Sequence, residues 1–304
     1  MVDHEQNAAE QEHGSSIADH LEYWTYKFDE SNPFMQIHVD TMIVTLVVAS
    51  LMIGFALWLR GKITEDAPTG AQNFTESVVD FINTTVNDNF PVHNPIVAPL
   101  AFTIFVFILL LNTIDIIPAY LIGHIASFVS AIVNGHEFVW GGHMPTVHFR
   151  PVPTNDLNLP AAMGVSVFIL VLYYEFKLKP VHFMKELVME PFTSLVPIYL
   201  KPIVMPINLI LKLVEEIAKP LSLSFRLFGN MFAGEVIFLL IASLLLVGSV
   251  EELMTVGGMI SEVMGILVGL AWSFFHLFIG LLQAFIFMIL TVVYLSIAHQ
   301  PVEH

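Results

Sequence analysis

Long apolar runs, separated by short polar stretches, are the main pattern along this chain of 304 residues. Three runs, at residues 42–59, 96–117 and 161–176, come close to the roughly 20 residues that a helix needs to cross a bilayer. Two more follow at 222–247 and 259–297, and the last is much longer than a perpendicular crossing requires. The pattern predicts an all-α membrane protein with about five membrane crossings, ending in two long tilted helices.

The segment at 195–219 differs from the other apolar runs because prolines and charges interrupt it. Proline removes a backbone donor and bends or ends a helix, and charged side chains at this density are typical of a helix at the membrane surface. We therefore expect a broken or interfacial helix here. The interrupting residues are Pro197, Pro202, Pro206, Lys201, Lys212, Glu215, Glu216 and Lys219.

Charge is scarce and unevenly placed. Only 12% of the residues are charged, and 27 acids against 11 bases give a formal charge of -16, which argues against the basic patches that bind nucleic acid. The first 37 residues hold many acids and a single base, Lys27, unlike a secretory signal or an Arg-rich transit peptide. The sequence thus predicts an acidic segment at 1–40, one membrane domain in lipid at 41–298, and a tail at 299–304.

Basic residues after the first and third runs predict the orientation of the chain. Arg60 and Lys62 follow the first run, and Lys177 and Lys179 follow the third. Lysine and arginine favour the cytoplasmic side of a membrane. We therefore expect an external N-terminus, an external loop at 119–160 and a cytoplasmic C-terminus, in the inner membrane of a bacterium.

The predicted external loop contains four histidines, which raises the question of a metal site. They lack the regular spacing of a ligand set, and His136 and Glu137 are not followed by a histidine three residues on, so the H-E-x-x-H zinc motif is absent. The chain also has no cysteine. We expect a solvated loop, no metal and no cofactor. The four residues are His124, His136, His143 and His148.

Arg226 lies inside the apolar run at 222–247, where a charge is costly. An arginine in the middle of a membrane helix costs roughly 3 to more than 10 kcal/mol, so it is retained where it lines water or meets an anion. At about 100° per residue, several polar residues share its face of the helix. Such a stripe predicts one wall of a hydrated path or a face presented to another protein. Its members are Glu215, Lys219, Ser222, Arg226 and Asn230.

A second set of polar residues lies farther along the last two runs. Glu235 is half a turn out of phase with Arg226, whereas His276 and Gln283 share one face of the last helix. If these two helices are antiparallel, His276 comes close to Glu235 and Gln283 lies nearer Arg226. We therefore expect an outer and an inner polar zone, separated by the arginine.

Structural explanations stay open for the same residues. A single histidine or glutamine in a membrane helix can serve as an interhelical hydrogen bond of about 0.6 kcal/mol. Arg226 can also be held in a buried ion pair with Glu215 or Glu235.

Three segments of the sequence resemble a known family. S-L-S-F-R-L-F-G-N-M-F-A-G-E at 222–235 is similar to the signature of subunit a of the F-type ATP synthases, bacterial type, in which an arginine is followed by L-F-G-N and A-G-E. F-H-L-F-I-G-L-L-Q-A-F-I-F at 275–287 and P-L-A-F-T-I-F-V-F-I-L-L-L-N-T-I-D-I-I-P at 99–118 agree with it. The resemblance covers about residues 40–298.

The resemblance implies a stator that stands beside a ring of c subunits, with a b-subunit peripheral stalk and the other ATP synthase subunits. In the family, the arginine meets each rotor carboxylate and separates two proton half-channels, so that proton flow drives rotation and ATP synthesis. A fixed cation in a low dielectric does favour the charged form of a passing acid. Arg226 matches the family's arginine, and Ser222 matches a residue in its neighbourhood. Four more residues match positions that line the outer half-channel or flank the arginine: Asn230, Glu235, His276 and Gln283. Asn112 and Asp115 match the entrance of that half-channel.

The inner exit is where the chain departs from the family. Tyr120 and Lys212 stand where some bacterial relatives carry carboxylates, so Glu215, Glu216 and Lys219 are the candidates for the inner side.

Two other classes of function are weighed beside the stator. A stand-alone ion channel or secondary transporter needs no partner and typically contains an inverted repeat, which we do not find in the sequence. An intramembrane hydrolase needs paired metal ligands or a nucleophile with its base inside the spans, and neither is evident. The chain also lacks the nucleotide loop G-x-x-x-x-G-K-[ST]. We therefore expect a non-catalytic, ion-translocating subunit.

Overall fold

The computed structural model describes residues 25–27, 36–64, 67–68, 70–92, 94–114, 152–189, 201–245 and 254–300. Almost all of them are helical. The exception is a hairpin of two short antiparallel strands, β1 (Thr25–Lys27) and β2 (Gln36–His38), in which Tyr26 pairs with Ile37. The all-helical membrane class predicted from the apolar runs is confirmed.

The helices follow the predicted runs closely. The first and third runs form α2 (Val39–Arg60) and α6 (Asn158–Leu178), and the last forms α10 (Val256–His299). α4 (Val97–Thr113) covers the second run, whose predicted end at 117 lies outside the described residues. Four helices in the described part of the chain are long and apolar enough to cross a membrane, and α4 is a shorter apolar helix.

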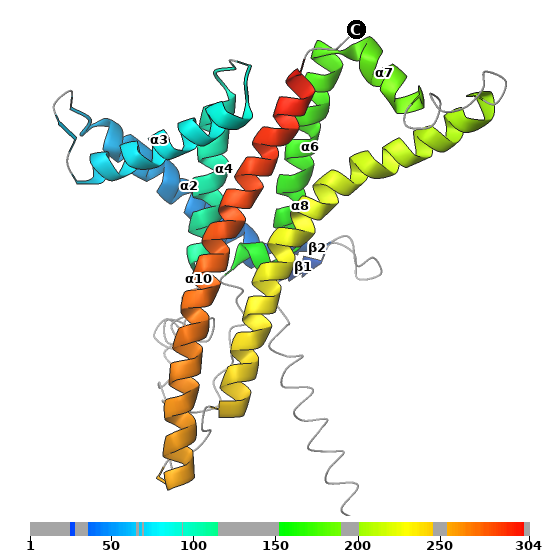
Figure 1. Cartoon of the computed structure of the whole chain (residues 1–304). Helices are drawn as coiled ribbons and strands as arrows, with labels where there is room; N and C mark the ends of the chain where they lie inside the picture. The colour runs from blue at the N-terminus through cyan, green and yellow to red at the C-terminus, as the bar shows by residue number, and fades with distance from the viewer. Residues whose placement is uncertain are drawn as a thin grey trace, which may run out of the picture.

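The segment expected to be broken joins the fourth run in one helix. α8 (Lys201–Leu245) is continuous for 45 residues and contains Pro206 and Pro220. Each proline removes one backbone donor, which bends a helix without ending it when the flanking turns stay packed. Figure 1 shows α8 changing direction along its length, so that its N-terminal half leans away from the other helices.

Two helices and a 3-10 turn had no counterpart among the predicted elements. α3 (Ala71–Asn89) is amphipathic and begins after Gly70, whose φ of 57° is a left-handed conformation that suits glycine. α7 (Pro180–Met189) follows α6 and packs on α8. The turn η2 (Pro153–Asn155) precedes α6, within the predicted external loop; the rest of that loop up to residue 151 lies outside the described residues.

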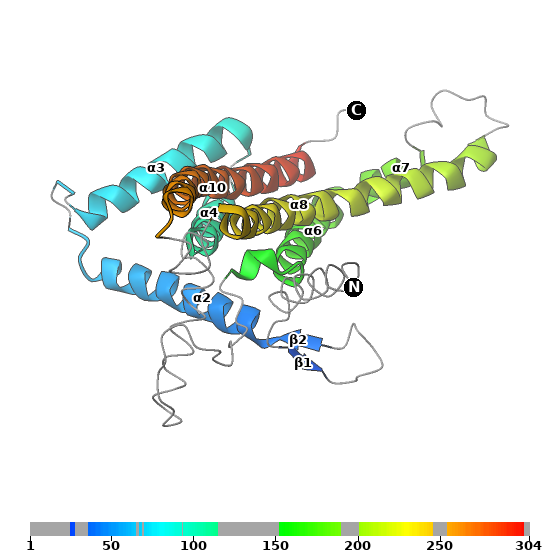
Figure 2. The same cartoon turned by 90° about the horizontal axis from the view of Figure 1, so that it is seen from below.

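The core lies where α10 meets α4, α6 and α8. Figure 2, seen from below, shows α10 and α8 side by side with α4 and α6 against them. The fully buried side chains at this junction include Ile108 of α4, Leu227 of α8 and Phe287 of α10. α3 covers the junction from one side, where Phe81 contacts both Phe105 and Phe285.

Many large apolar side chains point away from this core. On α2, for example, Leu46, Leu51 and Leu57 are each more than 60% exposed. Exposed apolar side chains in such number are typical of a surface that contacts lipid or another protein. The described helices therefore form a multi-pass membrane domain.

Candidate functional site

Arg226 lies on α8 between Ser222 and Asn230, as the predicted stripe requires. The arginine is partly buried, and both neighbours are exposed. No hydrogen bond or ion pair joins its guanidinium to any residue that the structure describes. The alternative in which Arg226 is buried in an ion pair with Glu215 or Glu235 is therefore not observed.

Asn230 and Gln283 connect the two long helices one turn from the arginine. The Nδ2 atom of Asn230 donates a hydrogen bond of 2.8 Å to the Oε1 atom of Gln283. The Gln283 side chain comes from α10, is 1% exposed, and its Nε2 is a buried donor without a partner among the described residues. A buried amide donor that stays unsatisfied is costly, so this position suits a polar ligand such as water.

His276 is buried against the backbone of Gly234, the residue before Glu235. A Cβ atom at position 234 would overlap the His276 ring, so only glycine leaves room for the histidine there. The ring is 3% exposed and also contacts Phe238 at 5.9 Å between ring centroids. The backbone oxygen of Gly234 accepts a hydrogen bond of 3.3 Å from Trp272 Nε1. His276 of α10 therefore lies beside the turn of α8 that carries Glu235. A direct contact between the two side chains stays a prediction.

Asn112 approaches the same helix from α4. Its Nδ2 donates to the backbone oxygen of Gly280 at 3.1 Å, and its Oδ1 is buried without a hydrogen-bond partner in the described structure. Gly280 permits this approach, because a Cβ there would lie 3.1 Å from the Asn112 Cβ. Gln283 is one turn farther along α10. Asp115, the other predicted entrance residue, lies outside the described residues.

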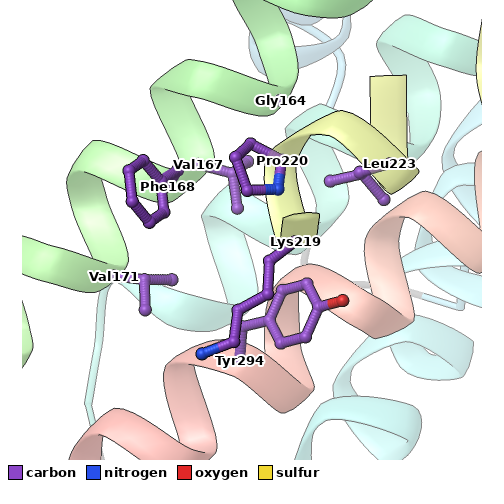
Figure 3. A pocket seen from close by; sticks show the side chains of 8 residues that line it. All are labelled: Gly164, Val167, Phe168, Val171, Lys219, Pro220, Leu223 and Tyr294. Atoms are coloured by element: carbon purple, nitrogen blue, oxygen red, sulfur yellow. The ribbon is translucent and has the colours of Figure 1, made fainter. Parts of the chain in front are cut away.

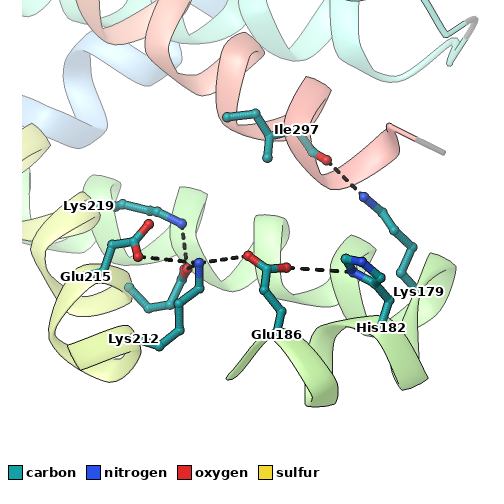
Figure 4. A network of polar contacts seen from close by, with 8 residues as sticks. Lys179, His182, Glu186, Lys212, Glu215, Lys219 and Ile297 are labelled. Carbon is teal, nitrogen blue, oxygen red and sulfur yellow. Dashed lines mark hydrogen bonds and ion pairs between the residues drawn. The ribbon is translucent and has the colours of Figure 1, made fainter. Parts of the chain in front are cut away.

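An ionic cluster joins α7 and the N-terminal half of α8 (Figure 4). Lys212 Nζ lies 2.8 Å from Glu186 Oε1, 3.4 Å from Glu215 Oε2 and 3.8 Å from Glu216 Oε1. Lys219 Nζ lies 2.6 Å from the same oxygen of Glu216. Lys219 therefore pairs with Glu216, and Glu215 contacts Lys212. We call Glu186, Lys212, Glu215, Glu216 and Lys219 the ionic cluster.

Another buried polar group, which the sequence pattern did not predict, lies at the start of α2. His38 Nδ1 lies 2.6 Å from Asp156 Oδ2, and Thr41 Oγ1 donates to the same oxygen at 2.9 Å. Asp40 is fully buried and accepts from the backbone N–H of Thr41 at 2.8 Å. These contacts fasten the start of α2 to the turn before α6. Asp40, placed directly before the first apolar run, was the signal available in the sequence.

The part of the chain that the structure describes contains no group of three or more histidine, aspartate or glutamate residues placed to hold a metal ion. The four loop histidines lie outside that part. The polar groups described above are instead spaced along α8 and α10. Amide, imidazole and carboxyl groups in such an order can pass protons between waters.

Comparison with known sequences gives consistent matches over most of the chain. Residues 42–296 match the family described as ATP synthase A chain. The ATP synthase subunit a of Ruthia magnifica subsp. Calyptogena magnifica is 39% identical over 303 residues, which cover 94% of this chain and 95% of the relative. That of Pseudomonas paraeruginosa is 40% identical over 269 residues, with 88% and 85% covered. That of Pseudomonas putida (strain GB-1) is 39% identical over 268 residues, with the same shares covered.

Proposed function

Because the chain belongs to the ATP synthase subunit a family, we propose that Arg226 is the fixed positive charge that meets a carboxylate of the rotating partner. The resemblance seen in the sequence is confirmed, and with it the function of a stator subunit in proton transport and ATP synthesis. The chain is a multi-pass membrane component of a complex with other ATP synthase subunits.

The observation that carries the proposal is that the guanidinium of Arg226 has no hydrogen bond or ion pair with any described residue. An arginine without an anion or water around it would not be retained in an apolar helix, given a cost of roughly 3 to more than 10 kcal/mol. Its own chain offers no carboxylate within reach among the described residues. Exposed apolar side chains flank it on α8, including Phe225 at 52% and Leu221 at 47%. A partner helix that carries one acid in an apolar surface fits this face, as a c-subunit ring would.

The polar residues on either side of the arginine then line two half-channels. Asn230, Gln283 and His276 lie on the side toward the C-terminus of α8, with Glu235 beside them and Asn112 nearby. We assign these residues, and Asp115, to the outer half-channel. Glu215 and Lys219 lie on the opposite side of Arg226 along α8, and we assign them to the inner one. Ser222 lies one turn before the arginine.

The arginine's role follows from electrostatics. Its charge stabilises the ionised form of a rotor carboxylate that stands opposite it, so the proton leaves before the rotor passes. The same charge repels a proton that would otherwise leak from one half-channel to the other. The chain itself makes and breaks no covalent bond in this scheme. A b-subunit peripheral stalk would hold it still against the turning ring.

We place the N-terminus outside and the C-terminus in the cytoplasm of the bacterial inner membrane. α2 and α6 each end in a base over an aromatic ring: Lys62 Nζ lies 4.2 Å from the Trp58 ring centroid, and Lys177 Nζ lies 5.3 Å from that of Tyr173. Bases and interfacial aromatics at the same ends favour the cytoplasmic surface for both. On this orientation the acidic segment at 1–40 and the loop at 119–160 are external.

The experiment is ATP-driven proton pumping by inverted membrane vesicles that carry the assembled complex. Arg226→Ala should abolish pumping while the complex still assembles, and it should raise the passive proton leak. Arg60→Ala is the matched control, because Arg60 is an exposed arginine at the end of α2, and it should pump normally. Pumping at the parental rate by Arg226→Ala would show that the arginine is structural.

A further inference from the structure

Glu216 is the most deeply buried carboxylate of the ionic cluster. Its side chain is 6% exposed, whereas that of Glu215, its neighbour in sequence, is 57% exposed. The Oε1 atom of Glu216 contacts both Lys219 and Lys212. The Oε2 atom is buried and has no hydrogen-bond partner in the described structure. A buried carboxylate oxygen without a donor is unfavourable, so a proton or a water molecule is required at this position.

A second buried carboxylate oxygen lies nearby on α6. Glu175 is within electrostatic reach of Glu216, and its Oε2 is likewise buried without a hydrogen-bond partner among the described residues. Glu175 is the only carboxylate in the apolar run of α6. Two neighbouring carboxylates repel each other, and the repulsion ends when one of them takes up a proton. Two glutamates that interact in this way, each with a buried oxygen that lacks a donor, can share a proton.

A small, mainly apolar pocket lies beside this pair. It lies between α6, α8 and α10 and is lined by Val171, Lys219, Leu223 and Tyr294, among others (Figure 3). Lys219 is shared between the pocket and the ionic cluster. Val171 is one turn before Glu175 on α6, and Leu223 is three residues before Arg226 on α8. Val171 and Lys219 therefore bring the turn before Glu175 close to the turn after Glu216.

We propose that Glu216 and Glu175 form a carboxyl pair that carries protons at the inner half-channel, between Arg226 and the cytoplasm. A proton released by the rotor carboxylic acid moves through water to the pair, and the rotor group is left as a carboxylate. The pair then releases a proton to the cytoplasmic water, and no electrons are transferred. The inference rests on the proposed function of Arg226 and adds the group that accepts its proton.

Charged and titratable groups on the neighbouring helices affect how readily the pair takes up a proton. α8 contributes Lys212, Lys219 and the exposed Glu215. α7 contributes Glu186, and Lys179 stands at the junction of α6 and α7. α10 contributes Tyr294, which lines the pocket with Lys219, and His299, whose ring centroid lies 4.5 Å from that of Tyr174, the residue before Glu175. The lysines keep one negative charge on the pair favourable, so the pair can give up a proton and regain it.

The test uses the whole ATP synthase in inverted vesicles, whose cytoplasmic face is turned to the bath. Glu216→Gln and Glu175→Gln are compared with Asp88→Asn, which removes an exposed carboxylate on α3 that belongs to neither proposed half-channel. Proton pumping is divided by ATP hydrolysis at each bath pH. We expect the first two variants to lose pumping by about tenfold or more, as is usual when a proton-transfer group is removed, and to shift its dependence on bath pH. Asp88→Asn should follow the parent.

Assembly and the proposed function are controlled separately. If Glu216→Gln does not assemble, Glu175→Gln and the conservative Glu216→Asp carry the test, and the latter should pump with an altered pH profile. Arg226→Ala is measured in the same series. If it abolishes pumping while the Glu216 and Glu175 variants pump like Asp88→Asn, the pair is refuted and the function stands. If Arg226→Ala pumps normally, the proposed function itself fails.

Discussion

Replacing Gly234 by alanine tests whether the position of His276 matters for proton transport. The added methyl group would overlap the His276 ring, which is 3% exposed and enclosed by α8 and α10. Overpacking of a buried site costs about 2 kcal/mol, and the gain from replacing a helical glycine offsets about 1 kcal/mol of it. The net cost of about 1 kcal/mol lowers the population of the present ring position about fivefold.

The assay is again ATP-driven pumping by inverted vesicles, normalised to the amount of assembled complex. Gly234→Ala should pump about fivefold more slowly than the parent, and the larger Gly234→Val should pump more slowly still. Gly269→Ala is the matched control on α10, because its Cβ would meet only Ile241, at 4.0 Å. It should leave pumping unchanged. Equal pumping by Gly234→Val and the parent would refute the reasoning, since the ring would then have no required position.

Two further replacements test how the helices are held together. Gly164→Ala places a Cβ 2.8 Å from the backbone oxygen of Pro220, so α6 and α8 must separate at a cost of about 1 to 3 kcal/mol. The solubilised complex should therefore release the subunit at a lower temperature. Gly54→Ala, whose Cβ meets nothing within 4 Å, is the control and should not lower it; equal release temperatures for the two variants would contradict the prediction. His38→Ala removes the 2.6 Å contact to the buried Asp156. It should lower the free energy of unfolding of the solubilised subunit by about 1.5 to 3 kcal/mol, as measured by thermal unfolding. An unchanged unfolding midpoint would mean that the contact contributes nothing.

The pattern along the chain was enough to predict which segments are helices and which polar residue needs an explanation. Apolar runs of membrane length can only be helices or barrel strands in lipid, because every backbone polar group must be satisfied. The charge of Arg226 inside such a run is unusual whatever the fold. The helical period also placed Ser222 and Asn230 on its face, and α8 keeps them there.

The ends and continuity of α8 were decided by packing. The prolines at 206 and 220 suggested a break, and the helix nevertheless runs through both. Local sequence shows the lost hydrogen bond at each proline, but it does not show the neighbouring helices that hold the flanking turns in place. α3 and α7 were missed for a related reason: both are too polar or too short to stand out as membrane runs, and both are stabilised by the helices they cover.

Only the tertiary structure shows which distant polar groups meet. Asn230 meets Gln283, His276 lies against Gly234, and His38 reaches Asp156 across 118 positions of sequence. Helical periodicity gives the direction of a side chain around its own axis, but not the distance, height and rotation of the next helix. Those depend on packing between α4, α6, α8 and α10, where small residues such as Gly234 and Gly280 set how closely the helices approach.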